Sequence, residues 1–217
     1  SYDITYTTAG VCANTLTISV TIDADQDASF NYSSASYCAG GVDPTPTITG
    51  TAGGTFTSAP VGLSLTAGTG AVDLSTSTPG AYTVTYTTAG PCSANSNQAI
   101  TIVADEDATY TYSSTTECQS GTDMTATITG TAGGTFTATP AGLTLNSTTG
   151  LIDVSTSTAN TYDVTYTTPG ACPATLIISV TINVDEDASF TLSSANECQS
   201  GTDATATITG TAGGAFT

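Results

Sequence analysis

A seven-residue string, Ile-Thr-Gly-Thr-Ala-Gly-Gly, occurs three times in the chain, beginning at residues 48, 128 and 208. The cysteines follow the same spacing, because they fall at positions 12, 92 and 172 and at positions 38, 118 and 198. All of these offsets equal 80 residues, without insertions. A constant period of this length predicts a tandem array of small structural units that share one fold.

The period divides the 217 residues into four parts. Complete repeats are expected at 25–104 and 105–184. Residues 1–24 are interpreted as the C-terminal part of a preceding repeat, and residues 185–217 as the N-terminal part of a following repeat. Because residue 1 falls within a strand pattern, we expect the chain to be an excerpt of a longer protein. A repeat of about 80 residues is long enough for a compact sandwich, especially if it is crosslinked.

Apolar residues alternate with Ser and Thr within each repeat, which is the period of half-buried strands. In the first complete repeat the alternation predicts six strands, at 30–32, at 46–48, from 56 onward, at 72–74, at 82–86 and at 100–102. No segment has helical periodicity. The predicted fold class is all-β, with Greek-key-like sandwich units of about 80 residues arranged head to tail.

The chain has no Lys, Arg or His, and it carries 18 acidic residues. Salt bridges between side chains are therefore impossible within it. Binding to nucleic acid or to an anionic membrane depends on Lys and Arg, so neither partner is expected. No window of 18 apolar residues suggests membrane insertion. A hydrophobic content of 38% in regular alternation also argues against a disordered acidic segment.

Enzymatic activity is not expected either. Without His or Lys, the chain cannot build a Ser-His or Ser-Lys arrangement. The Gly53-Gly54 pair is predicted to form a hairpin turn, and it is followed by neither a helix nor a Lys, so it is not a phosphate-binding loop. Acidic residues that recur every 80 positions fit a mechanical role better than a unique active site.

Residues 140–165 carry a sequence pattern that is also found in other proteins. Residues 140–146 read Pro-Ala-Gly-Leu-Thr-Leu-Asn, and they are followed by Thr-Gly-Leu-Ile at 149–152 and by Tyr-Asp-Val-Thr at 162–165. This pattern resembles bacterial immunoglobulin-like domains. The whole repeat is similar to repeats of giant surface proteins of Bacteroidetes, including gliding-motility adhesins exported by type IX secretion. The resemblance implies an immunoglobulin-like sandwich in an extracellular, cell-surface adhesin or filament stalk.

Two cysteines per repeat at fixed positions predict disulfide bonds in an oxidising compartment. A zinc site is the weaker interpretation, because the chain has no C-x-x-C spacing and no His. The disulfide candidates are Cys12, Cys38, Cys92, Cys118, Cys172 and Cys198.

The sequence leaves two connectivities open. The predicted topology places Cys38 and Cys92 at opposite ends of a unit. A strand of about six residues spans roughly 20 Å, whereas bridged Cα atoms lie within about 7 Å. One hypothesis is therefore an inter-repeat bond, Cys38–Cys172, between units that abut end to end. The other is a pair of intra-repeat bonds, Cys38–Cys92 and Cys118–Cys172, which requires the first strand to end nearer the hairpin.

Acidic residues gather at the repeat junctions. Carboxylate oxygens without a nearby cation are the ligands that Ca²⁺ prefers, so calcium is a candidate cofactor. The competing interpretation is that these are solvated charges that keep repeats apart, since the spacing does not match an EF-hand loop. The candidate ligands are Asp43, Asp105, Glu106 and Asp107 at one junction, and Asp123, Asp185, Glu186 and Asp187 at the next.

The function predicted from these features is a structural stalk or filament segment of a secreted surface adhesin. Its partners would be neighbouring repeats of the same chain and other copies in a filament. The alternative is that the repeats themselves bind a ligand, either polysaccharide or ice, through rows of hydroxyls such as Thr83, Thr85 and Thr87. The Tyr residues mostly fall at inward positions and Asp163 interrupts the equivalent row, which favours the stalk.

Overall fold

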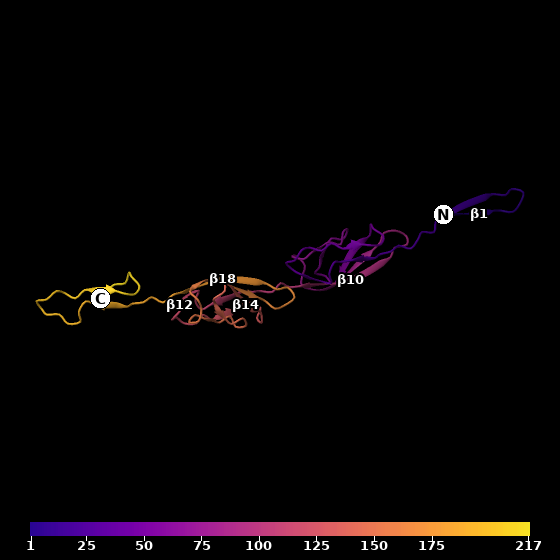
Figure 1. Ribbon diagram of the computed structural model, residues 1–217. Coiled ribbons are helices and arrows are strands. Elements are labelled where there is room, and N and C mark those ends of the chain that lie inside the picture. The colour runs from indigo at the N-terminus through magenta and orange to yellow at the C-terminus, as the bar shows by residue number, and fades with distance from the viewer. The chain divides into compact units, whose positions relative to one another are not determined.

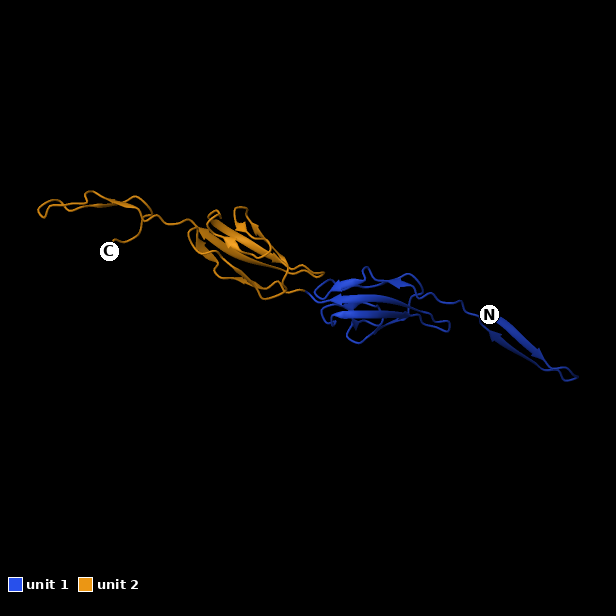
Figure 2. Cartoon of the chain, turned by 90° about the horizontal axis from the view of Figure 1, so that it is seen from below, with its two compact units in different colours: residues 1–105 blue, residues 106–217 orange.

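The computed structural model describes residues 1–217, which form strands and turns but no helix (Figure 1). No helix long and apolar enough to span a membrane is therefore present. The chain divides into two compact units, unit 1 (Ser1–Asp105) and unit 2 (Glu106–Thr217), which are coloured separately in Figure 2. The prediction of an all-β chain is confirmed.

Unit 1 begins with a hairpin of two strands and continues with the eight strands of a complete sandwich. The hairpin strands are β1 (Tyr2–Thr7) and β2 (Thr15–Val20). The sandwich strands are β3 (Phe30–Asn31), β4 (Ser36–Cys38), β5 (Thr47–Ile48), β6 (Thr55–Ala59), β7 (Ser64–Leu65), β8 (Val72–Asp73), β9 (Gly80–Thr87) and β10 (Asn95–Val103).

One layer of the unit 1 sandwich is a four-stranded sheet in the order β4-β10-β9-β6. Strands β6, β9 and β10 pair antiparallel, whereas β4 pairs parallel to β10. The short pairs β3-β5 and β7-β8 are separate from this sheet. Long strands form where apolar and Thr residues alternate for eight residues, as in β9, because one face can then pack on the core while the other faces water.

Unit 2 repeats this arrangement and ends with a second hairpin. Its four-stranded sheet has the order β12-β18-β17-β14, and its short pairs are β11-β13 and β15-β16. The strands are β11 (Tyr110–Tyr112), β12 (Thr116–Cys118), β13 (Ala126–Ile128), β14 (Thr135–Thr139), β15 (Thr144–Leu145), β16 (Ile152–Asp153), β17 (Asn160–Thr167) and β18 (Thr175–Asn183). The terminal hairpin consists of β19 (Phe190–Leu192) and β20 (Ala206–Ile208).

Three aromatic rings form the centre of each core. In unit 1, the Phe30 and Phe56 rings lie 5.4 Å apart edge to face, and Tyr86 lies 4.5 Å from Phe56. Tyr110, Phe136 and Tyr166 repeat this cluster in unit 2. Edge-to-face pairs of this kind contribute roughly 0.5–1.5 kcal/mol beyond the burial of their area. The apolar positions that alternate with Ser and Thr in the sequence are therefore the positions that face the core.

All six strands predicted for the first complete repeat have counterparts, but β4 and β7 were not predicted. Both are too short to show alternation, with three and two residues. Strand β4 exists because Ser36, Tyr37 and Cys38 pair with Thr101, Ile102 and Val103 of β10. Such long-range parallel pairing leaves no local signal in the sequence.

Candidate functional site

The six cysteines are in two different states. Cys38 in unit 1 and Cys172 in unit 2 are each disulfide-bonded. The other four cysteines are free thiols, namely Cys12, Cys92, Cys118 and Cys198. Cys172 is buried, with 4% of its surface exposed, and its carbonyl oxygen accepts a hydrogen bond from the Glu106 N–H at 3.1 Å.

The position of Cys38 is set by the parallel strand pair at the edge of the unit 1 sheet. Cys38 ends β4 opposite Val103, the last residue of β10, and the Ala39 N–H donates to the Val103 carbonyl at 2.9 Å. Cys92 lies in the turn before the first residue of β10. The nine residues of β10 separate the two ends by ~27 Å at 3.3–3.4 Å per residue.

This separation excludes an intra-repeat bond without rearrangement of the sheet, because bridged Cα atoms lie within about 7 Å of each other. In agreement with this separation, Cys92 and Cys118 are free thiols. The structure therefore contains neither the Cys38–Cys92 nor the Cys118–Cys172 bond. The physical reason is that β4 runs parallel to β10 and ends at the far end of that strand.

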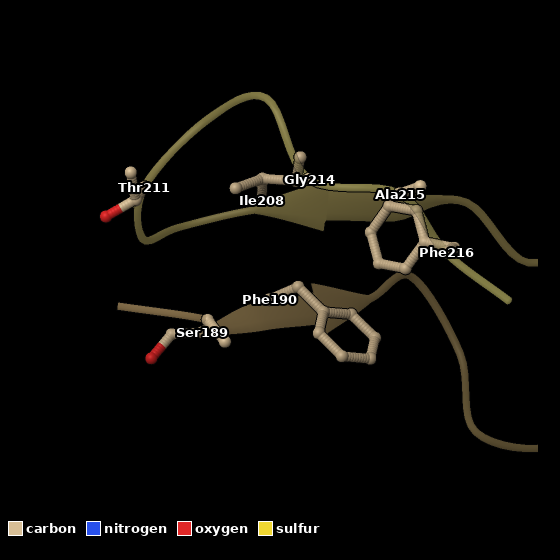
Figure 3. A pocket seen from close by; sticks show the side chains of 8 residues that line it. Ser189, Phe190, Ile208, Thr211, Gly214, Ala215 and Phe216 are labelled. Carbon is tan, nitrogen blue, oxygen red and sulfur yellow. The ribbon is translucent and has the colours of Figure 1, made fainter. Parts of the chain in front are cut away.

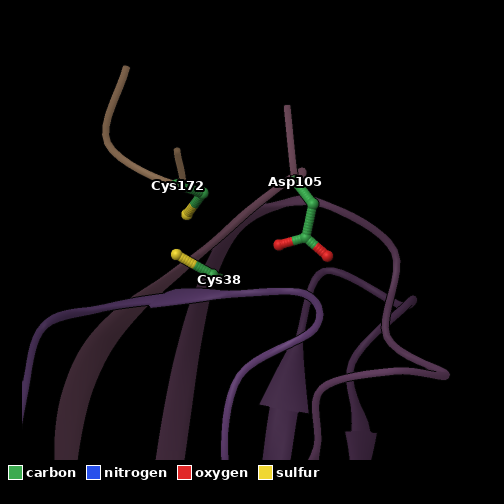
Figure 4. A group of neighbouring side chains, drawn as sticks. All are labelled: Cys38, Asp105 and Cys172. Carbon is green, nitrogen blue, oxygen red and sulfur yellow. The ribbon is translucent and has the colours of Figure 1, made fainter. Parts of the chain in front are cut away.

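Asp105 is the acidic residue that lies next to Cys38. A carboxylate oxygen of Asp105 and the sulfur of Cys38 lie within 4.8 Å of each other (Figure 4). The carboxylate packs so closely on Gly40 that a Cβ atom there would overlap Asp105 Oδ2. In unit 2 the equivalent Asp185 accepts hydrogen bonds from Ser120, from the N–H at 2.9 Å and from the hydroxyl at 2.7 Å.

The remaining candidate calcium ligands are also used inside their own units. Asp43 accepts from the Leu74 N–H at 2.9 Å, and Asp123 accepts from the Val154 N–H at 3.2 Å. Glu106 accepts from the Gly170 N–H at 3.1 Å. These bonds fix the loops that carry Asp43, Asp123 and Glu106 to the sandwich of their own unit.

Asp107 and Asp187 close turns that begin strands β11 and β19. The Asp107 carboxylate accepts from the hydroxyl and the N–H of Thr109, and the Asp187 carboxylate accepts from the same groups of Ser189. The hydroxyl and N–H bonds hold the pKa of both carboxyls below the usual value of 3.8. Glu186 is exposed. Within either unit taken alone, no three of these carboxylates lie within ligand distance of one another.

The Tyr side chains of the two complete repeats point inward. Tyr82, Tyr86, Tyr162 and Tyr166 are at most 5% exposed, and no Tyr between residues 25 and 184 is exposed. On the outer face, hydroxyls pair across strands, as in Thr85 with Asn97 at 2.8 Å and Thr161 with Thr181 at 3.0 Å. The complete repeats therefore offer no exposed Tyr for stacking on a sugar.

No protein-family model and no curated protein matches the chain. Among solved structures, mouse cadherin-23 repeats EC22–24 are 13% identical, with 83% of this chain and 73% of that chain covered and a TM-score of 0.33. A Ca²⁺-stabilised adhesin with which an Antarctic bacterium binds ice is 18% identical, with 88% and 59% covered and a TM-score of 0.33. Protocadherin gamma B2 repeats 3–6 are 10% identical, with 86% and 59% covered and a TM-score of 0.33. The chain thus spans less than two thirds of the last two.

Proposed function

We propose that the chain is a segment of an extracellular stalk or filament, in which β-sandwich repeats transmit force and disulfides join successive repeats. The observation that carries the proposal is recurrence: both units have the same strand order and the same buried aromatic core. Stability in such an array comes from each unit and from its neighbours, which suits a mechanical role. The absence of Lys and His removes the usual bases and nucleophile partners, so this role is not enzymatic.

Within this proposal, Cys38 and Cys172 are bonded to each other as an inter-repeat crosslink. Two facts support it: these are the two disulfide-bonded cysteines, while the other four are free. The bond would enclose 172 − 38 = 134 residues of chain. In the chain-entropy model a loop of this size stabilises the folded state by about 5 kcal/mol. The equivalent cysteines would use partners in adjacent repeats.

The finer assignment, to giant Bacteroidetes surface proteins of the gliding-motility adhesin kind, belongs to the same proposal. It is supported by the residue pattern between 140 and 165 and by the disulfide-bonded cysteines, which are typical of an oxidising, extracellular location. Expression of the tagged protein in such a bacterium, with and without type IX secretion, tests it. Surface labelling that persists without this secretion system would refute the export route.

Force spectroscopy on the 217-residue chain tests the mechanical proposal directly. With the crosslink intact, residues between 38 and 172 cannot extend under load. Reduction should therefore lengthen the fully stretched chain by about 460 Å, at 3.3–3.6 Å per residue. The variant Cys172→Ser should show the longer extension without reductant. Equal extensions before and after reduction would refute the crosslink, and unfolding at negligible force would refute the stalk.

Calcium at the acidic segments stays a proposal, supported by the concentration of carboxylates and by the lack of any Lys, Arg or His to pair with them. Melting curves in millimolar Ca²⁺ and in chelator test this. A rise of several degrees in Ca²⁺ would support the site, and superimposable curves would exclude it.

A further inference from the structure

A cavity of about 250 Å³ at the β19-β20 hairpin is a core position of the repeat (Figure 3). Its lining includes Phe190 and Phe216, whose counterparts at an offset of 160 residues are Phe30 and Phe56. The Tyr86 ring lies 4.5 Å from Phe56 and 5.9 Å from Phe30, so a Tyr of the same repeat fills this position in a complete sandwich. The cavity therefore has no binding function of its own.

A negative charge lies beside the disulfide-bonded sulfur of Cys38 in unit 1. A carboxylate oxygen of Asp105 and the Cys38 Sγ atom lie within 4.8 Å of each other (Figure 4). Cys38 is half-buried, whereas Asp105 is exposed. Because the chain has no Lys, Arg or His, no side chain can neutralise this carboxylate by ion pairing. Its charge therefore acts on any reaction at the sulfur.

The fold of unit 1 holds both groups in this place. Cys38 ends β4 opposite Val103, the last residue of β10, and Asp105 follows two residues later. The Gly41 N–H donates to the Cys38 carbonyl at 3.0 Å and closes the turn after β4. A Cβ atom on Gly40 would lie 2.5 Å from Asp105 Oδ2, so the carboxylate occupies space that a residue without a side chain leaves open. The proximity thus follows from the parallel pairing of β4 with β10 and from Gly40.

Reduction of a disulfide by a thiol moves negative charge onto its sulfurs. A thiolate anion attacks one sulfur and bonds to it, the S–S bond breaks, and the electron pair leaves on the other sulfur as a second thiolate. The departing thiolate takes a proton from water. A second thiolate from solution then attacks the mixed disulfide in the same way and releases the other cysteine. A fixed negative charge close to the sulfurs opposes each of these steps, because like charges repel.

We propose that the Asp105 carboxylate slows the reduction of the Cys38 disulfide by small-molecule thiols. If the incoming thiolate attacks the Cys38 sulfur, the carboxylate repels the thiolate. If it attacks the partner sulfur, Cys38 leaves as the thiolate, and the carboxylate opposes the charge that develops there. Both directions of attack are therefore slowed. This inference rests on the proposed crosslinked stalk and deepens it, because it names a residue that protects the crosslink.

The exposed position of Asp105 sets the size of the effect, since water screens the repulsion. The interaction of two unit charges about 4 Å apart in water corresponds to about a fivefold change in rate. Salt weakens the repulsion further, because the Debye length falls from about 10 Å at 0.1 M to about 3 Å at 1 M. The protection should therefore be moderate at low salt and small at high salt.

Reduction kinetics of the full chain test the proposal with Asp105→Asn, which removes the charge and keeps the shape of the side chain. The free thiols are alkylated first, and chelator is present so that no bound cation masks the carboxylate. Mass spectrometry then counts the protein thiols that the reductant releases. With 2-mercaptoethanol, whose thiolate carries no other charge, the substitution should accelerate release about fivefold at low salt. In 1 M NaCl the acceleration should fall to about twofold or less.

The charge of the reductant separates repulsion from a loss of structure. The thiol 2-mercaptoethanesulfonate carries an additional negative charge, and cysteamine carries a positive amine. The acceleration by Asp105→Asn should be larger with the sulfonate than with 2-mercaptoethanol, and it should be smaller with the amine. A substitution that only loosened the edge of the sheet would accelerate all three reactions equally.

The matched control is Asp27→Asn, which removes one negative charge from the other end of the same sandwich. Its amide oxygen can still accept from the N–H and the hydroxyl of Ser29. Asp27 follows Gln26, whose N–H donates to the Cys92 carbonyl at 3.3 Å, so it lies at the end opposite Cys38. At this separation the control should change each rate by less than about twofold.

A count of thiols before reduction separates this inference from the crosslink itself. Four thiols per chain show that the disulfide is present. Equal rates in the wild type and Asp105→Asn, equal acceleration with all three reductants, or the same acceleration by Asp27→Asn would then overturn the role of Asp105 and leave the crosslink standing. Six thiols per chain would remove the crosslink, and this inference would fail with it.

Discussion

Tyr86 and its repeat counterpart Tyr166 join the two layers of each sandwich through one hydroxyl. That hydroxyl bonds to a carbonyl and an N–H of the Gly-rich turn after β5 or β13. Period-2 alternation predicted that these Tyr side chains point inward. The hydroxyl's partners lie 32 and 35 residues away, so no local pattern could identify them.

Tyr86→Phe should lower the free energy of unfolding of unit 1 by about 1–2 kcal/mol. The substitution keeps the ring but leaves a carbonyl and an N–H without their partner. Denaturant unfolding measures the change, and Thr83→Ala, on the outer face of the same strand, should stay within about 0.5 kcal/mol. Equal effects of the two substitutions would contradict the role of the hydroxyl.

Asp73 and Asp153 cap tight turns after β8 and β16. In unit 2 the Asp153 carboxylate accepts from the Ser155 hydroxyl at 2.7 Å and from the Thr156 N–H at 3.2 Å. Hydrogen bonds from Ser155 and Thr156 hold the pKa of Asp153 below 3.8, and those from Ser75 and Thr76 do the same for Asp73. The partners lie only two and three residues along the chain, in the string Asp-x-Ser-Thr, so the sequence does contain a local signal for these turns.

Stability should therefore fall as the pH drops below about 4. A carboxyl whose pKa is lower in the folded chain stabilises it above the unfolded pKa, and that contribution is lost as pH falls through the folded pKa. Melting temperature measured from pH 6 to pH 2 checks this. The double variant Asp73→Asn and Asp153→Asn, whose amide oxygens still accept, should show a shallower decline. An identical decline would show that these two caps do not titrate as described.

At the scale of the element, the Gly53-Gly54 turn sets how closely the chain approaches β9, and the parallel strand β4 sets the position of Cys38. A Cβ atom on Gly54 would overlap the Thr87 carbonyl oxygen, so this turn can approach β9 only without a side chain. The sequence predicted the turn from its composition. It could not predict β4, which is defined by pairing with residues 101–103, and for that reason it left the cysteine connectivity open.

Gly54→Ala should destabilise unit 1 by about 1–3 kcal/mol, because the added methyl group would overlap backbone atoms of Thr87 and Thr88, which the sheet holds in place. The matched control is Gly68→Ala, since nothing lies within 4 Å of a Cβ atom at Gly68. Thermal unfolding followed by circular dichroism compares them. If the control were as unstable as Gly54→Ala, close approach would not be the cause.

At the scale of the whole molecule, all charged side chains have the same, negative sign. Eighteen carboxylates without a Lys, Arg or His can only repel one another. Screening by salt therefore relieves repulsion and breaks no side-chain ion pair. The composition alone predicts this repulsion and its screening by salt, because the sign of the charges does not depend on the fold.

Melting temperature should rise steadily as NaCl increases from about 10 mM to about 1 M, because the Debye length shortens over that range. Comparison of NaCl with KCl controls for binding of a particular cation. A melting temperature that falls with either salt would contradict a chain without attractive charge pairs.

The central claim, that a covalent crosslink ties one repeat to the next, is tested most directly by peptide mapping without reduction. Trypsin has no site, because the chain lacks Lys and Arg, whereas cleavage before Asp releases Cys38 in 27–42, Cys92 in 73–104 and Cys172 in 163–184. We predict that mass spectrometry finds 27–42 linked to 163–184. A link between 27–42 and 73–104, or the full set of six alkylated thiols, would contradict the account.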